Sequence, residues 1–191
     1  MSGKDTSVGE RAAVEQQVMQ WLQDVVIGLN LCPFANKPMR AGQVRLWVSE
    51  ALAEEALLAD IETELQRLDS EPVTRLETTL VIAPKVLSDF WDYNQFIDWV
   101  ESLISRNGWQ GVYQLATFHP HYCFAGAEPE DAENLTNRAP YPIFHLIREA
   151  SMAEVLNRYP DPESIPENNI DRVSALTEAE RRRLFPYLLN R

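Results

Sequence analysis

The side chains that could do chemistry gather in one segment of the chain, residues 117–149. All three histidines of the sequence, His119, His121 and His145, fall within it. In an extended chain His119, His121 and Cys123 point to the same side, because side chains alternate along a strand. Imidazoles combined with carboxylates are typical of sites for a divalent metal and of acid–base sites. We therefore expect the chemistry of the protein in this segment.

His145 and Glu149 are four positions apart, so both side chains would share one face of a helix predicted over residues 143–157. His119 would lie just past the carboxyl end of a predicted strand, the edge at which open α/β sheets place their ligands. His119, His145 and Glu149 would then bind one divalent transition metal, zinc or iron, or work as acid and base without a metal. The segment contains no regular metal-binding motif. Three interpretations are therefore kept: a metal site, a metal-free acid–base site, and a network of polar side chains with a structural role.

Two arginines of the same segment, Arg138 and Arg148, suit a negatively charged ligand. Asn134 and Asn137 supply amide donors beside Arg138, and the predicted helix that follows would present free backbone N–H groups. These groups can hold a carboxylate or a phosphate. The alternative is a turn in which the same side chains bond to the backbone. Asp131 either orients a histidine or is solvated.

Cys32 is the second chemical feature, because it follows a predicted helix and precedes a proline. A thiol beside an imidazole can act as a nucleophile, but a helix C-terminus raises the pKa of a thiol. Cys32 is therefore a candidate nucleophile, against a role as a packing residue or a ligand. Cys32 and Cys123 are the two cysteines of the chain. We expect both to be reduced, because a cytosolic chain of this length folds without disulfides.

The elements that must position these groups follow from hydrophobic spacing. Alternating or continuous apolar runs predict strands over residues 43–48, 78–83 and 111–118. Helical spacing predicts helices over residues 10–28, 50–69, 88–108, 143–157 and 177–189.

Strands joined by helical crossovers imply an α/β fold, with a small parallel or mixed sheet of at least three strands flanked by helices. Residues 119–142 are rich in proline and have no helical period. A long segment of this kind inside a domain is usually functional, so we expect a functional loop after the third strand.

Length and charge bound the class of protein. A chain of 191 residues with 45% hydrophobic residues is expected to form one domain, over 10–191, after a disordered start at 1–9. The formal net charge of −12 argues against nucleic acid and anionic membranes as partners. No apolar stretch is long enough for a membrane span or a signal segment, so we expect a cytoplasmic protein.

Several stretches resemble a bacterial family of domains of unknown function, numbered 1415. They are GLNLCPFA (28–35), TLVIAP (79–84), DFWDYNQF (89–96), FHPHYCFA (118–125) and NLTNRAPYPIFHLIREAS (134–151). The resemblance covers roughly residues 10–170 and brings no activity with it. It does imply a ranking of residues.

The family pattern F-H-P-x-Y-x-F matches His119 and Tyr122, and leaves His121 and Cys123 at loosely specified places. The resemblance therefore moves His121 and Cys123 to the second rank of metal ligands, with Asp131. The patterns N-x-T-N-R-x-P-Y-P and H-x-x-R-E match the remaining candidates, which are Asn134, Asn137, Arg138, Tyr141, His145, Arg148 and Glu149, and the LCPF element contains Cys32.

We therefore expect a small enzyme that acts on a small anionic molecule through His119, His145 and Glu149, with a metal or as acid and base. Hydrolase and oxygenase chemistry are not distinguishable at this point. Substrate contacts are expected from Arg138, Asn137, Arg148, Asn134, Tyr122 and Tyr141. A binding module that holds a metal or an anion without turnover is one alternative. A thiol-dependent hydrolase or transferase that uses Cys32 is the other.

Overall fold

A four-stranded mixed sheet forms the centre of the protein in a computed structural model, which describes residues 3–189, with side chains from residue 8 onward. The strands are β1 (Val44–Val48), β2 (Thr78–Ile82), β3 (Tyr113–Phe118) and β4 (Ile143–Arg148). Their order in space is β1-β2-β4-β3, with β1 parallel to β2 and β4 antiparallel to both of its neighbours. The sheet and its helices confirm the α/β fold class and the mixed sheet.

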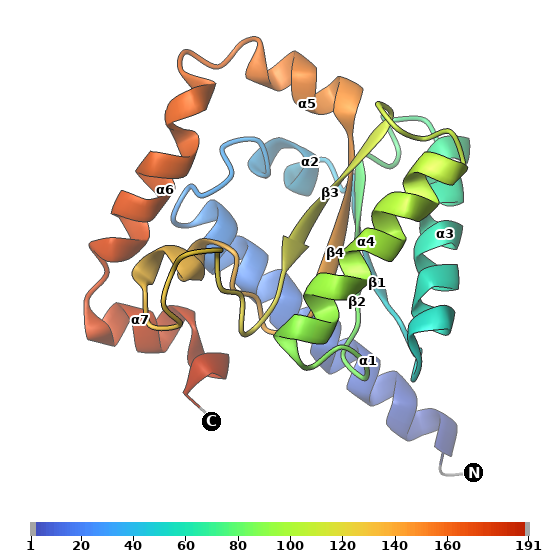
Figure 1. The fold of residues 1–191 in the computed structure, drawn as a ribbon, viewed down its shortest axis with the longest axis horizontal. Coiled ribbons are helices and arrows are strands. Elements are labelled where there is room, and N and C mark those ends of the chain that lie inside the picture. The colour runs from blue at the N-terminus through green and yellow to red at the C-terminus, as the bar shows by residue number, and fades with distance from the viewer. Residues whose placement is uncertain (1–2, 190–191) are drawn as a thin grey trace.

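Helices flank the sheet on both faces (Figure 1). The α-helices are α1 (Gly3–Trp21), α2 (Asn36–Arg40), α3 (Glu54–Ser70), α4 (Phe90–Arg106), α5 (Glu149–Leu156), α6 (Ile165–Ser174) and α7 (Glu178–Leu184). The other helical segments are a π-helix, η1 (Leu22–Ile27), and the short 3-10 helices η2 (Ala132–Thr136), η3 (Pro162–Ser164) and η4 (Pro186–Leu188). In Figure 1, α6 and α7 lie on the opposite side of the molecule from α3 and α4.

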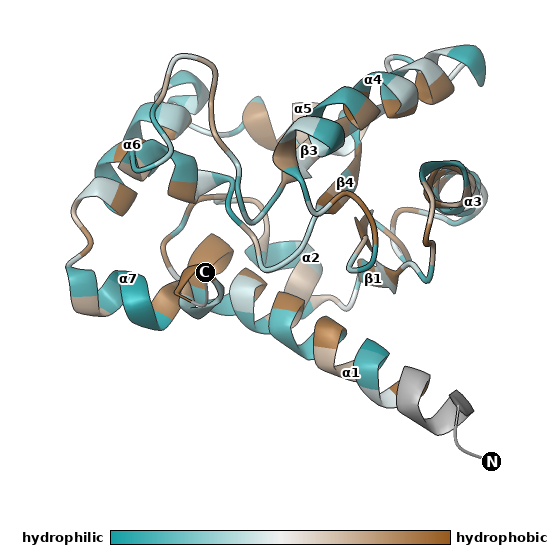
Figure 2. Cartoon of the chain, turned by 60° about the horizontal axis from the view of Figure 1, so that its bottom comes forward, coloured by the Kyte–Doolittle hydropathy of each residue, from teal (hydrophilic) through white to brown (hydrophobic). Residues whose placement is uncertain are grey.

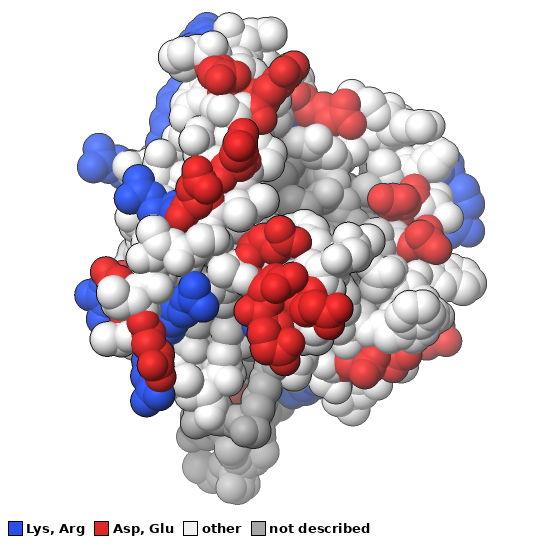
Figure 3. Space-filling model, turned by 60° about the vertical axis from the view of Figure 1, so that its left-hand side comes forward, with Lys and Arg blue, Asp and Glu red and all other residues white. Residues whose placement is uncertain are grey.

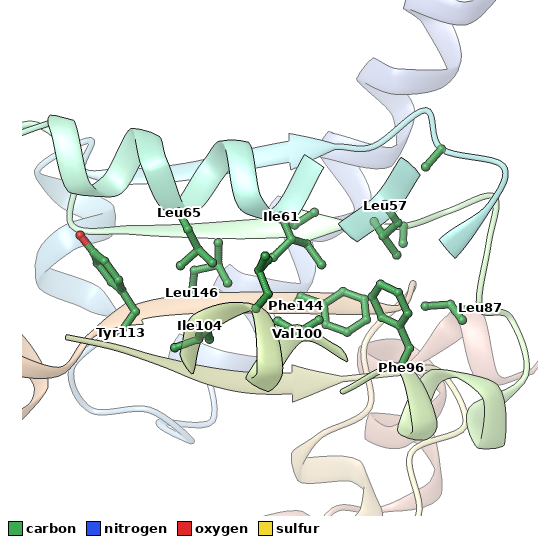
Figure 4. Packing of buried hydrophobic residues seen from close by; sticks show 14 of the residues in the cluster. Leu57, Ile61, Leu65, Leu87, Phe96, Val100, Ile104, Tyr113, Phe144 and Leu146 are labelled. Carbon is green, nitrogen blue, oxygen red and sulfur yellow. The ribbon is translucent and has the colours of Figure 1, made fainter. Parts of the chain in front are cut away.

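One face of the sheet, here called the first face, is covered by α3 and α4. Leu57 and Ile61 of α3 and Val100 of α4 point toward Phe144 of β4 in Figure 4, and all four are fully buried. Buried residues recur every three or four positions along each helix, as expected of an apolar stripe packed on a core: Leu57, Ile61, Leu65 and Leu68 in α3, and Tyr93, Phe96, Val100 and Leu103 in α4. Burial of such side chains contributes about 1.5–3 kcal/mol each, so this face forms one of the two hydrophobic cores of the protein.

The second face is covered by α1 and η1. Val18 and Trp21 of α1 pack with Leu80, Ile82 and Ile143 from the strands. Because successive side chains of a strand point to opposite faces, the neighbours of these strand residues belong to the first face. Figure 2 shows the resulting pattern, with hydrophobic strands and helices that alternate between hydrophilic and hydrophobic residues.

The largest difference from the expected elements concerns residues 143–157, for which the sequence predicted one helix. Residues 143–148 instead form β4, and only the part from Glu149 on is helical. β4 lies between β2 and β3, and its residues enter the hydrophobic cores on both faces of the sheet, so its apolar residues run almost without interruption. Such a run cannot be told from a buried helix by periodicity alone.

The amino-terminal helix begins earlier than expected. α1 starts at Gly3, so the segment 1–9 that was predicted to be disordered is helical from that residue on; residues 1 and 2 lie outside the described part. Each added residue gains one hydrogen bond once a helix has formed, which lets the helix extend over polar sequence. Helices α2 and α6 were not predicted. Among residues 3–189 no helix combines the length and apolar character that a bilayer span requires.

Candidate functional site

His119 lies directly after β3, and its side chain is fully buried. Its Nδ1 accepts a hydrogen bond from the backbone N–H of His121 at 2.9 Å, so Nε2 carries the proton and donates to the Leu87 carbonyl at 3.1 Å. The ring packs on the first face against Tyr93 and Phe90, with centroids 4.9 and 5.3 Å away. His119 therefore ties the turn after β3 to the loop before α4.

His145 lies on the opposite face of the sheet. Its neighbours in β4, Phe144 and Leu146, belong to the first-face core, so His145 points to the second face, where its ring lies 6.4 Å from that of Phe118. Nε2 is 2.7 Å from the hydroxyl of Thr78. Burial lowers the pKa of His145 to about 4, so the ring is neutral at physiological pH.

The predicted set of His119, His145 and Glu149 does not come together. The two histidines are separated by the sheet, and Glu149, whose backbone N–H donates to the Val112 carbonyl, lies beside the start of β3 whereas His119 follows its end. The prediction that they converge was wrong because it placed His145 and Glu149 on one helix. Within residues 3–189 no group of three or more His, Cys, Asp or Glu side chains is arranged to hold a metal ion.

Asn134 organises the loop between β3 and β4. Its side chain is fully buried, with Nδ2 donating to the Glu128 carbonyl at 2.7 Å and Oδ1 accepting from the Phe124 N–H at 2.9 Å. The Asp131 carboxylate accepts from the Glu128 N–H at 2.8 Å in the same loop. These side chains satisfy backbone groups that the irregular segment would otherwise leave without partners.

Asn137 and Arg138 continue this network. Asn137 Nδ2 donates to the Thr117 carbonyl at 3.0 Å. The Arg138 guanidinium donates to the carbonyls of Tyr122 at 3.2 Å and Pro129 at 2.5 Å, and burial lowers the Arg138 pKa. The donors that were expected to hold a substrate anion are thus directed at the backbone of residues 117–129. This is the turn alternative raised by the sequence.

Arg148 lies outside this loop. Its guanidinium donates to the carbonyls of Leu68 at 2.5 Å, Glu71 at 2.7 Å and Leu76 at 3.2 Å, around the C-terminal end of α3. The guanidinium also lies over the ring of Tyr113, 5.9 Å from its centroid. Carbonyls at the end of a helix lack partners within the helix, so Arg148 caps α3 rather than joining Arg138 in one site.

The remaining predicted site residues also lie apart from one another. The Tyr122 ring packs between two phenylalanines, with centroids 4.9 and 5.2 Å away, and the Tyr141 hydroxyl donates to a glutamine of α1 at 2.8 Å. His121 is exposed next to His119, with ring centroids 5.7 Å apart. The Cys123 thiol donates to a carbonyl of its own loop at 3.4 Å. These contacts describe a well-ordered loop, not a common centre.

Cys32 follows an unusual backbone segment. The π-helix η1 is followed by Gly28, whose N–H donates to the Gln23 carbonyl at 2.9 Å. A Cβ at Gly28 would lie 2.3 Å from the Asp24 carbonyl oxygen, so only glycine fits there. Asn30 then adopts the left-handed conformation with φ of 55°, and the chain turns away from α1. π-helical turns are frequent at functional sites.

The Cys32 thiol lies on the second face of the sheet, the face to which His145 also points. Burial raises the pKa of the thiol, although the backbone N–H groups of Phe34 and Ala35 act in the opposite direction. The thiol and Cys123 are both free. Cys32 is thus mostly protonated at neutral pH, which limits its nucleophilicity.

A pocket of about 430 Å³ lies between this segment and α6. Asn169 joins the two walls, because its Nδ2 donates to the Leu31 carbonyl at 2.7 Å. The polar lining consists of Asn30, Asn168, Asn169, Asp171 and Arg172. The apolar and aromatic lining consists of Pro33, Tyr159, Ile165 and Ala175.

Arg172 is the cation of this pocket. It is exposed, and among residues 3–189 its guanidinium has neither an ion pair nor a hydrogen-bond acceptor. Acidic side chains spread over the face of the molecule shown in Figure 3, in keeping with the net charge of −12. This pocket was not predicted from the sequence, because α6 was not predicted. The available signal was Pro166 near the start of an amphipathic run that ends with the buried Val173.

The comparisons with known proteins give a family and no activity. Neither the curated proteins nor the solved structures include a match to this chain. One family model matches residues 13–183, a span that contains the sheet, the loop between β3 and β4, the Cys32 segment and α6. The chain therefore belongs to the family described as protein of unknown function (DUF1415).

Proposed function

We propose that the protein binds a small molecule with a negatively charged group in the pocket between residues 30–33 and α6. The observation that carries the proposal is the Arg172 guanidinium, which has no ion-pair partner among the described side chains, at the wall of a pocket of about 430 Å³. Guanidinium groups bind carboxylates and phosphates through two parallel hydrogen bonds, which makes arginine the usual residue for such ligands.

The rest of the pocket supports a small ligand. Its volume falls in the range of about 300–1,000 Å³ that is typical of small-molecule sites. Pro33, Ile165 and the ring of Tyr159 offer an apolar wall, and asparagine side chains offer donors and acceptors that fix orientation. This proposal keeps the expected small anionic ligand but moves its site from the loop after β3 to the Cys32 segment. With both cysteines free, we also propose the reducing cytoplasm as its compartment.

The experiment uses two probes that combine an aromatic body with an anionic group, 3-phenylpropionate and phenyl phosphate. Each is titrated into the ¹⁵N-labelled protein, and backbone amide shifts are recorded by NMR. We expect the largest shifts around Asn30, Asn168 and Arg172, and Arg172→Gln should weaken binding at least tenfold.

Arg158→Gln is the matched control, because Arg158 is exposed, pairs with Glu154 at 2.8 Å and does not line the pocket. It should bind both probes as the wild type does. Absence of binding, or shifts centred on the loop 119–138, would contradict the proposed site. Equal binding by Arg172→Gln and the wild type would contradict the proposal that Arg172 binds the anionic group of the ligand.

Thiol chemistry at Cys32 is a second candidate, favoured by one observation. Two backbone N–H groups, those of Phe34 and Ala35, lie where they stabilise a thiolate, directly beside the pocket-lining Pro33. The effect of burial is larger than that of these two N–H groups and raises the pKa of the Cys32 thiol. We therefore prefer ligand binding to thiol chemistry as the proposed function. Cys32→Ala separates the two: it should leave 3-phenylpropionate binding within about twofold, since a buried-thiol-to-methyl change removes no charge from the pocket.

A further inference from the structure

Two opposite charges line the proposed pocket. Asp171 and Arg172 are consecutive residues of α6, both exposed and both lining the pocket. Consecutive residues are separated by roughly 100° around a helix axis, so their side chains diverge and do not face each other. Within the described residues neither side chain has an ion-pair partner within 4.0 Å.

This arrangement leaves two charges available to one ligand. A ligand with only a negative group would satisfy Arg172 and leave the Asp171 carboxylate facing its anion from nearby, which is unfavourable. A ligand that also has an ammonium group would satisfy both charges at once. Because the charges of Asp171 and Arg172 cancel, the charged lining of the pocket matches a ligand without net charge.

Part of the pocket lining is apolar or aromatic. The Tyr159 ring is held edge-on by Phe34, with centroids 5.5 Å apart and an interplanar angle of 79°. The Tyr159 ring, Pro33 and Ile165 together form a surface suited to an aliphatic or aromatic side chain of a ligand. The asparagine amides are partly engaged, since Asn168 Nδ2 donates to the Ser164 hydroxyl at 3.0 Å, which leaves its oxygen as an acceptor.

We infer that the ligand of this pocket is an amino-acid-like zwitterion with an apolar side chain. Its carboxylate binds Arg172, its ammonium group binds Asp171, and its side chain lies against Tyr159 and Ile165. The inference rests on the proposed function and names the ligand class for that same pocket. No covalent step is involved.

Four probes with one side chain test the inference by calorimetric titration. L-phenylalanine has both charges, 3-phenylpropionate and N-acetyl-L-phenylalanine have only the carboxylate, and L-phenylalaninamide has only the ammonium group. We expect L-phenylalanine to bind at least tenfold more tightly than each of the other three. Its affinity should change little between 50 and 300 mM salt, because the ligand has no net charge.

Two variants test which pocket residue binds the ammonium group of the ligand and which binds its carboxylate. Asp171→Asn should reduce L-phenylalanine binding to the level of 3-phenylpropionate, at least tenfold, and leave 3-phenylpropionate binding equal or tighter. Arg172→Gln should weaken both. Glu167→Gln is the matched control, since Glu167 is an exposed carboxylate of α6 that does not line the pocket. All variants change exposed side chains, and unchanged melting temperatures should show that they fold.

The outcomes separate the inference from the proposed function. If 3-phenylpropionate binds as tightly as L-phenylalanine, and Asp171→Asn changes neither, the zwitterion inference is overturned and the anion pocket stands. If neither 3-phenylpropionate nor L-phenylalanine binds at 10 mM, both are overturned. Tight binding of L-phenylalaninamide that survives Arg172→Gln would replace the inference with a cation pocket and contradict the proposed function.

Discussion

His145 of β4 and Thr78 of β2 are diagonal neighbours on adjacent strands, with Nε2 of the histidine 2.7 Å from the threonine hydroxyl. The hydroxyl also lies 2.6 Å from the Leu146 carbonyl, to which it donates its single hydrogen. It must therefore accept from Nε2–H of a neutral imidazole. The pair lies within the sheet, where His145 is buried. Because burial lowers the pKa of His145, the stability of the fold should depend on pH.

Stability should fall as pH is lowered through the range between the two pKa values of His145. The ordinary value is 6.5 and burial lowers the folded value to about 4, so the unfolded chain binds more protons than the folded chain in between. Between pH 7 and pH 5 this group should cost the folded state about 2 kcal/mol. Urea unfolding at both pH values measures the difference, and His145→Gln should reduce it by that amount.

Asn157→Ala is the control for this titration, because Asn157 is exposed and has no titratable group. Its unfolding curves should keep the wild-type dependence on pH. If His145→Gln and the wild type lose equal stability between pH 7 and pH 5, the imidazole is charged in the folded protein at pH 5 and its burial is not the cause.

Removal of the Arg148 guanidinium should destabilise the fold. Arg148→Met leaves carbonyls at the end of α3, including those of Leu68 and Glu71, without their donor, which should cost about 2–4 kcal/mol of unfolding free energy. The unfolding free energy of Arg148→Lys should lie between those of the wild type and Arg148→Met, since an ammonium group cannot reproduce the planar, forked set of donors of a guanidinium. Arg158→Met, at an exposed surface pair, should cost less than about 0.5 kcal/mol. Equal stability of the two Met variants would contradict the capping role.

Loss of the Asn134 side chain should loosen the loop between β3 and β4. Asn134→Ala removes the partners of the Phe124 N–H and the Glu128 carbonyl, with an expected cost of about 2–3 kcal/mol. Hydrogen exchange of the Phe124 amide should accelerate at least tenfold. Asn157→Ala, at an exposed position after α5, should leave that amide unchanged. Unaltered exchange in Asn134→Ala would show that other contacts hold the loop.

The Cys32 thiol should react slowly at neutral pH. In a Cys123→Ser variant, alkylation by iodoacetamide at pH 7.5 should be several-fold slower than that of free cysteine, because burial raises the pKa and limits access. The rate should still be rising at pH 9. Mass spectrometry after timed quenching measures it. Alkylation faster than that of free cysteine would instead favour thiol catalysis at this residue.

The sequence by itself determined the elements whose hydrophobic pattern is local. The amphipathic stripes of α3 and α4 and the apolar runs of β1, β2 and β3 each lie within one segment, and their positions agree with the predicted ranges within a few residues. The start of the helix predicted over residues 177–189 is also formed, and it has a capping box of Thr177 and Glu180 that needs only four consecutive residues. These local agreements were sufficient to identify the α/β class.

Only the tertiary structure decided which chemical groups meet. The identity of residues 143–148 as a strand depends on pairing with β2 and β3, which lie far away in the chain, and that pairing sends His145 to the face opposite His119. Likewise, the spacing of Asn134, Asn137 and Arg138 could not show whether their donors would face a ligand or the backbone of their own loop. The pocket forms because Asn169 meets the Leu31 carbonyl across more than half of the chain. A period in the sequence records which face of an element is buried, whereas contacts between distant segments depend on the free energy of the whole packed chain.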